Sequence, residues 1–335
     1  MADQLLLIGA GGFVGRGIAA AAARRGIATT GLVRSPSPAL DGSGVEVMVG
    51  DARAAGLGLH PDDAEGLARR TTTIVMAAGR AKLSLSLVDA QREHVAAVQG
   101  AVDFARRCPH LERIVYLSSM VAVGQVSGPL RSDFVPVSLR VRNFYEWAKA
   151  EGERVVRTSG LPACIVRPGH VWNSTDDSLR TTVPVGVFET LPLLAAGWPL
   201  PVDALARYWI APVDLVADIT LAVATGAGTG RAVWAVDPAS PRLGEVLDLL
   251  AFRHGLRARR VTGGRMGRLL ADNVQPRWLG VDVDREAFAY GFVDWRLDLR
   301  CLDELTAGGA LDLPTDRSYV TATIDHEVRR RCVLP

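Results

Sequence analysis

Cysteine and long uncharged apolar runs are both scarce in this chain of 335 residues. Its cysteines are Cys108, Cys164, Cys301 and Cys332. They lie far apart and form no C-x-x-C pair, so neither a zinc site nor a disulfide framework is indicated, and we expect a cytoplasmic protein in a reducing environment. The most apolar later segment, 183–202, contains Glu189 and several prolines, so we expect no membrane span.

The chain has little net charge of either sign, and we expect no N-terminal signal peptide. The 38 basic and 36 acidic residues leave a net charge of +2, which argues against nucleic acid or an anionic membrane as a general partner. Asp3 stands where a signal peptide would need basic charge. We therefore expect a small-molecule partner, bound by one domain with an elaborated C-terminal part.

A glycine-rich segment follows the first apolar run. The run Leu5–Ile8 suits a buried parallel strand, and the alanine-rich run that ends at Arg25 suits a helix. Between them lies the sequence Gly9-Ala10-Gly11-Gly12-Phe13-Val14-Gly15. Glycine loops also occur as plain turns, but one placed between a strand and a helix brings backbone amides against a pyrophosphate. The pattern predicts a dinucleotide site at Gly9, Gly12, Phe13, Val14 and Gly15.

The next two predicted strands supply candidates for the adenosine half of the cofactor. The second, Thr29–Val33, ends in Arg34-Ser35 rather than in an acid. An acid there would bind the ribose hydroxyls of NAD, whereas an arginine can pair with the 2′-phosphate of NADP. NADPH is therefore favoured, and NADH stays open. Asp51 follows the third strand, where it either reaches the adenine amino group or serves as a turn residue.

Strands and helices alternate further along the chain. A fourth strand, Thr73–Met76, opens on Ala77-Ala78-Gly79, whose small side chains let the backbone approach a cofactor. A long crossover helix is expected over 88–108 and a fifth strand over 113–117. This alternation predicts an α/β fold with a Rossmann-type, doubly wound parallel sheet.

Hydroxyl and ammonium groups follow the fifth strand. That strand runs into Ser118-Ser119, and Tyr145 and Lys149 stand four residues apart on a predicted helix. The lysine ammonium can then lie beneath the phenol and favour its ionised form. A strand-end serine faces the same edge of the sheet, an arrangement that suits proton transfer to a carbonyl oxygen. A Tyr-x-x-x-Lys pair alone is usually a surface pair, so the prediction depends on the glycine loop and the serine.

This order of motifs resembles the extended short-chain dehydrogenase/reductase family over roughly 5–236. The resemblance is carried by Gly9-x-x-Gly12-x-x-Gly15, Leu117-Ser118-Ser119, Tyr145-x-x-x-Lys149 and Arg167-Pro168-Gly169. It implies that Ser119, rather than Ser118, acts in catalysis together with Tyr145 and Lys149. It also implies that the cofactor contacts include Tyr145, Lys149, Pro168, Gly169, His170 and Val171.

Within that family the chain is most similar to stand-alone proteins of the thioester reductase type, which release acyl chains from carrier proteins or coenzyme A. The similar segments are 31–34, 49–51 with 57–59, and 211–217. The resemblance implies an NADPH-dependent reductase of an apolar acyl thioester or related carbonyl compound, giving an aldehyde or an alcohol. Coenzyme A or a separate acyl carrier protein is then a candidate partner.

Two positions depart from the family pattern. Val75-Met76 stands where many relatives have a histidine before the paired alanines, and His94-Val95 stands where an asparagine-valine pair is usual. The missing asparagine alters either a proton relay or a packing contact, and His94 itself is expected to be structural.

The sequence divides into two expected parts. Residues 1–170, with a strand near 230–237, form the NADP-binding Rossmann domain, and 171–210 with 238–335 form a smaller, mostly helical substrate lobe. The large apolar residues of the lobe are Trp172, Phe188, Leu191, Leu193, Leu194, Trp198 and Trp209. Most are expected to be ordinary core, but any that face the site favour a fatty, isoprenoid, aromatic or steroid-like substrate.

Six arginines between 253 and 268 form a basic run that either receives coenzyme A phosphates or an acidic carrier, or is a solvated face.

Two other functions stay open. One is dehydrogenation of an alcohol such as a hydroxysteroid, or epimerisation of a nucleotide sugar, which would need more polar groups in the lobe. The other is a non-catalytic NADP-binding sensor, which could dispense with the tyrosine and lysine that this chain has.

Overall fold

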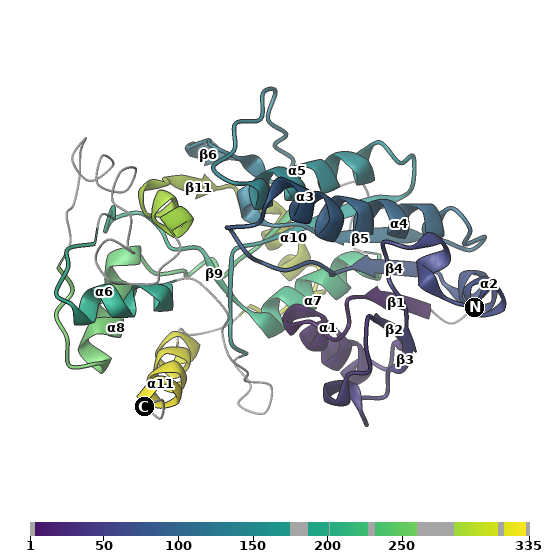
Figure 1. Cartoon of the computed structure of the whole chain (residues 1–335), viewed down its shortest axis with the longest axis horizontal. Helices are drawn as coiled ribbons and strands as arrows, with labels where there is room; N and C mark the ends of the chain where they lie inside the picture. The colour runs from purple at the N-terminus through teal and green to yellow at the C-terminus, as the bar shows by residue number, and fades with distance from the viewer. Residues whose placement is uncertain are drawn as a thin grey trace.

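The computed structural model describes residues 4–174, 187–200, 202–226, 232–259, 285–313 and 318–332. Its centre is a seven-stranded parallel sheet of strand order β10-β7-β5-β4-β1-β2-β3 (Figure 1). The strands are β1 (Gln4–Ile8), β2 (Ala28–Val33), β3 (Glu46–Val49), β4 (Thr73–Met76), β5 (Arg113–Leu117), β7 (Ala163–Pro168) and β10 (Ala232–Ala235). The order reverses between β1 and β4, and this confirms the predicted doubly wound fold.

Helices cover both faces of the sheet. On one face lie α1 (Phe13–Arg24), α7 (Val213–Ala224) and α10 (Arg300–Ala307). On the other lie α2 (Pro61–Arg70), α4 (Ala96–Ala105) and α5 (Phe144–Arg157). Because both faces are covered, the central strands are mostly apolar, and β4 and β5 are buried at every residue.

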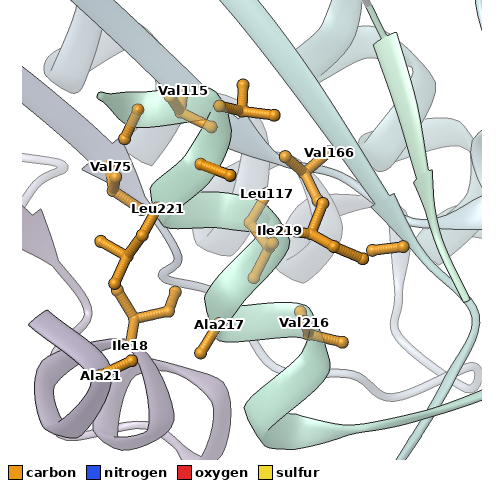
Figure 2. Close-up of a cluster of buried hydrophobic side chains, with 14 of the residues drawn as sticks. Ile18, Ala21, Val75, Val115, Leu117, Val166, Val216, Ala217, Ile219 and Leu221 are labelled. Atoms are coloured by element: carbon orange, nitrogen blue, oxygen red, sulfur yellow. The ribbon is translucent and has the colours of Figure 1, made fainter. Parts of the chain in front are cut away.

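Figure 2 shows the core on the first face, where α7 crosses the sheet and packs beside α1. Its side chain Leu221 lies beside Val75 and Ile219 lies toward Val166 of the sheet, while Ala217 lies on the side that faces α1. These helices are rich in small and aliphatic residues, and this composition allows the close approach that holds them over the strands.

The crossover helix predicted over 88–108 is interrupted. It consists of α3 (Leu87–Ala90), the π-helical turn η3 (Gln91–Val95) and α4. Ser86 caps its start by accepting a hydrogen bond of 3.1 Å from the amide of Asp89. A π-helical turn adds a residue to one turn of helix and often marks a functional position.

The C-terminal part has a separate apolar core. It is built from η6 (Val187–Thr190), α6 (Leu191–Ala195), α8 (Leu243–Arg253), α11 (Ser318–Cys332) and the small sheet of β8 (His170–Trp172) and β9 (Ile210–Pro212). The other short elements are η1 (Pro38–Leu40), η2 (Ala55–Gly58), η4 (Met120–Val123), η8 (Arg285–Phe292) and the paired strands β6 (Gly128–Leu130) and β11 (Trp295–Leu297). Outside the main sheet, the four strands within the described residues have three residues each, too few to give a readable period.

The apolar residues predicted for the lobe fall into three groups. Trp172, Phe188, Leu191, Leu193 and Leu194 are buried in the lobe's own core, as expected for most of them. Trp198 is 43% exposed, and Trp209 belongs to another cluster, beside the candidate site.

The basic run is partly outside the described residues, since Arg260, Arg265 and Arg268 lie beyond them. Within the described part, Arg253 pairs with Asp325 at 3.0 Å, and Arg257 and Arg259 are exposed.

None of the helices that the structure describes combines the length and apolar character needed to cross a bilayer. Nor do the described residues include a group of three or more His, Cys, Asp or Glu side chains that could hold a metal ion.

Candidate active site

The glycine loop lies at the carboxyl edge of the sheet, between β1 and α1. Gly9 has a φ of +92°, and a Cβ atom there would lie 2.7 Å from the backbone of Ala78. A Cβ atom on Gly15 would lie 2.1 Å from the carbonyl oxygen of Gly9. Side chains are therefore excluded where the loop, the start of α1 and the segment after β4 meet. The first-turn amides of α1 remain available to an anion, so these residues fit a dinucleotide pyrophosphate.

The predicted adenosine contacts lie along the neighbouring strand ends. Arg34 and Ser35 are exposed directly after β2. Asp51 is bound by Arg53, whose Nε lies 2.8 Å from Oδ1, and this contact first, with Arg34 adding a smaller effect, lowers the pKa of the carboxyl group. The sequence patterns did not indicate Arg16. Its guanidinium donates to the carbonyl of Gly11 at 3.1 Å and adds a cation beside the loop.

Ser119, Tyr145 and Lys149 are brought together. Ser119 caps η4, accepting a bond of 3.4 Å from the amide of Val121, and its hydroxyl hydrogen-bonds the phenol of Tyr145. Tyr145 lies in the first turn of α5, one helical turn before Lys149. The ammonium of Lys149 donates to the carbonyl oxygen of Leu117 at 3.0 Å. All three side chains therefore meet where β5 ends.

The sequence led us to expect that the Lys149 ammonium favours the ionised form of the Tyr145 phenol, and the structure differs from this expectation. Burial raises the pKa of Tyr145 to about 12, and the hydrogen bond from Ser119 only partly offsets this. The ammonium lies 5.9 Å from the centre of the Tyr145 ring and 5.2 Å from that of Tyr116, and one of its three N–H groups donates to the Leu117 carbonyl. Burial lowers the pKa of Lys149 to about 8, against the opposing charge of Glu153. At neutral pH the phenol is protonated, as a proton donor must be.

Ser118 points away from the trio. Its hydroxyl donates to Oε1 of Glu153 at 2.7 Å. The guanidinium of Arg167 donates to both oxygens of the same carboxylate, at 2.8 and 2.6 Å. The Arg167 guanidinium is also stacked over Trp234. Ser118 and Arg167 are thus parts of a buried network that joins β5, α5 and β7. Glu153 was missed, although its position four residues after Lys149 on one helical face could have indicated it.

The segment after β7 continues past the trio. Pro168 is buried and Val171 half-buried, and the amides of Gly169 and His170 donate to the carbonyls of Ala235 and Trp209 at 3.1 and 2.8 Å. The His170 ring stacks on Tyr208 with centroids 4.2 Å apart, and burial lowers the pKa of His170 to about 4. A neutral aromatic pair therefore separates this segment from the lobe.

Apolar side chains surround the proton donor. The Tyr145 cluster consists of Leu85, Ala90, Met120, Val121, Val123, Leu130, Tyr145, Ala148, Trp209, Trp234, Val236, Val293 and Trp295. The indole of Trp209 donates to the carbonyl of Trp295 at 2.7 Å, and that of Trp295 donates to Val126 at 3.1 Å. Trp295 was missed because nothing local places residue 295 beside residue 145.

Solved structures of similar fold come from reductive and epimerising proteins. The terminal R domain of the myxalamid PKS-NRPS biosynthetic pathway is 20% identical, with a TM-score of 0.79, over 98% of this chain and 91% of that chain. A UDP-galactose 4-epimerase is 16% identical, with a TM-score of 0.66, over 98% and 99%. A UDP-glucuronic acid 4-epimerase from Bacillus cereus, in complex with NAD, is 15% identical, with a TM-score of 0.64, over 97% and 95%. No curated protein matches the sequence significantly.

A doubly wound sheet with a dinucleotide loop and a hydroxyl–ammonium trio at its carboxyl edge defines an NAD(P)-dependent oxidoreductase. The family model described as male sterility protein, a model of NAD-binding domains, matches residues 16–220, more than half of the chain. The chain belongs to this family, a thioester reductase-like branch of the extended short-chain dehydrogenases/reductases, as its motifs predicted.

Proposed function

We propose that this protein is an NADPH-dependent reductase of an apolar acyl thioester or a related carbonyl compound. The observation that carries the proposal is the placement of Tyr145, a protonated phenol bound to Ser119 within an apolar cluster. A substrate carbonyl that meets the phenol in this cluster would be desolvated, and desolvation strengthens the hydrogen bonds made to its oxygen.

The roles of the trio follow from its contacts. NADPH, held by the glycine loop and by the backbone after β4 and β7, would supply a hydride to the carbonyl carbon. Ser119 would hold the carbonyl oxygen, and Tyr145 would pass its proton to that oxygen. Lys149 would position the ribose and stabilise the phenolate that remains. With a thioester, loss of the thiol leaves an aldehyde, which a second reduction takes to an alcohol.

An apolar substrate is supported by the aliphatic and aromatic side chains that pack around Tyr145, among them Met120, Val121 and Trp209. A nucleotide sugar would need polar partners for its hydroxyls at this position. Residues 171–210 and 238–335 are proposed as the substrate lobe.

NADPH rather than NADH is proposed because the residue that follows β2 is not an acid but the exposed Arg34. Arg16 adds positive charge beside the glycine loop. The exposed Arg257 and Arg259 are proposed contacts for coenzyme A or for an acidic carrier protein.

The test is NADPH oxidation, followed by absorbance, with acyl-coenzyme A substrates of increasing chain length. We expect kcat/KM to rise with chain length, and Tyr145→Phe to lose turnover while it keeps NADPH binding. Undiminished turnover in Tyr145→Phe would remove the assigned acid. A preference for a UDP-sugar or a hydroxysteroid over every thioester would replace the reaction. NADPH binding without turnover on any carbonyl or alcohol would favour a sensor.

A further inference from the structure

His94 is a buried histidine that the proposed reaction does not use. It lies in the π-helical turn η3 and is 1% exposed. Its Nε2–H donates to the carbonyl oxygen of Arg80 at 3.1 Å, while Nδ1 is buried without a hydrogen-bond partner. An apolar side chain would fill such a position at lower cost, because an unpaired buried polar atom is unfavourable. The imidazole therefore needs an explanation beyond packing.

One edge of the imidazole meets the proton donor. The rings of His94 and Tyr145 have centroids 5.4 Å apart and planes at 75°, an edge-to-face contact. Burial, and then the charge of Lys149, lower the pKa of His94 to about 3, so the ring is neutral at physiological pH. A neutral ring places no second positive charge beside the ammonium of Lys149.

The other side of the imidazole meets the segment after β4. Gly79 has a φ of +127°, and a Cβ atom on it would lie 2.5 Å from both Cε1 and Nδ1 of His94. The preceding residue of the π-helical turn, Glu93, binds the guanidinium of Arg80 at 2.6 and 2.7 Å. Two consecutive residues of η3 thus hold Arg80: the side chain of Glu93 binds the Arg80 guanidinium, and the side chain of His94 binds the Arg80 backbone carbonyl.

We propose that His94 is a positioning residue that couples the segment Ala77–Arg80 to Tyr145. Its ring sets the orientation of the phenol, and its Nε2–H sets the path of the backbone that approaches the cofactor. Both residues that contact this segment, Glu93 and His94, lie in the π-helical turn. The inference rests on the proposed function for its kinetic consequence, but the two contacts exist independently of any substrate.

Two variants separate the two contacts. His94→Gln keeps an N–H donor at about the position of Nε2 and loses the ring, whereas His94→Leu keeps apolar bulk and loses both. We expect kcat to fall roughly tenfold or more in both variants, because small displacements of a reacting group cost large factors in rate. We expect the Kd for NADPH to rise in His94→Leu and to stay at the wild-type value in His94→Gln.

A readout without turnover is the 19F NMR spectrum of protein that carries 3-fluorotyrosine. The chain has five tyrosines, so the Tyr145 signal is the one missing in Tyr145→Phe. It is expected to shift and narrow in both His94 variants. Phe104→Leu is the control, a cavity in the same crossover region within a different core cluster. It should lower thermal stability and leave the Tyr145 signal and kcat unchanged.

An unchanged Tyr145 signal, or wild-type kcat in both variants, would overturn the role of His94. A wild-type protein that turns over no carbonyl substrate would instead overturn the proposed function, and the spectrum and NADPH binding would still decide the role of His94.

Discussion

The phenol of Tyr290 donates a hydrogen bond of 2.7 Å to Oε1 of Glu146, although 144 residues separate them in the chain. Glu146 directly follows Tyr145 and its side chain is fully buried. The same phenol accepts a bond of 2.9 Å from Asn143, which caps α5, and the Arg142 guanidinium is stacked on its ring. The C-terminal part of the chain therefore fixes the start of the helix that carries the proton donor.

Tyr290→Phe should lower both stability and rate. It removes one partner of a buried carboxylate, a loss of about 1.5–3 kcal/mol in unfolding free energy for a bond to a charged group. Urea unfolding measures this loss, and a double-mutant cycle with Glu146→Gln isolates the pair. A cycle that gives strict additivity would mean that the two side chains are not coupled.

Arg34→Ala should weaken NADPH binding and hardly change NADH binding. Loss of a charge-assisted contact to the 2′-phosphate corresponds to about a 10- to 100-fold increase in Kd. Fluorescence titration with each cofactor measures the change. Arg69→Ala is the control, because Arg69 is an exposed arginine on α2 whose recorded ion pair is with Glu65. Equal losses for both cofactors would contradict the assignment of the 2′-phosphate to Arg34.

Lys149 should give stability a distinctive pH dependence. Its folded pKa of about 8 lies below the ordinary 10.5, so between these values the unfolded chain binds more protons than the folded one. The free energy of unfolding therefore rises with pH in this window. Above pH 10 the raised pKa of Tyr145 acts in the opposite direction, because the unfolded phenol ionises first.

The comparison is between wild type and Lys149→Met, unfolded in urea at pH 7 and at pH 10. Wild type should gain on the order of 2 kcal/mol relative to the variant over this interval. A difference that stays constant with pH would show that the ammonium is not buried as described.

Gly15→Ala should abolish dinucleotide binding and destabilise the fold. The new methyl would lie 2.1 Å from the Gly9 carbonyl, a backbone atom that cannot move away without opening the loop. We expect a loss of about 1–3 kcal/mol, as for other overpacked sites. Gly66→Ala is the matched control within α2, where a methyl meets nothing within 4 Å, and it should stabilise by up to about 1 kcal/mol through helix propensity. Retained NADPH affinity in Gly15→Ala would refute the loop's role.

Some features were readable because their cause is local. Strand β4 was predicted at both ends and β1 to within one residue, since a strand covered on both faces is a continuous apolar run. The edge shared by Ser119, Tyr145 and Lys149 followed from helical spacing and from the parallel direction of the strands. The π-helical turn was not predicted, since residues 91–95 have ordinary helical composition.

The sequence by itself determined the fold class, the dinucleotide loop and the order of the hydroxyl, phenol and ammonium groups, because each depends on spacing within a strand or a helix. Only the tertiary structure decided the protonation of Tyr145, the turn of Ser118 toward Glu153, and the contacts of His94, Trp295 and Tyr290. Burial and long-range contacts are sums over segments distant in the chain, and no local pattern records them.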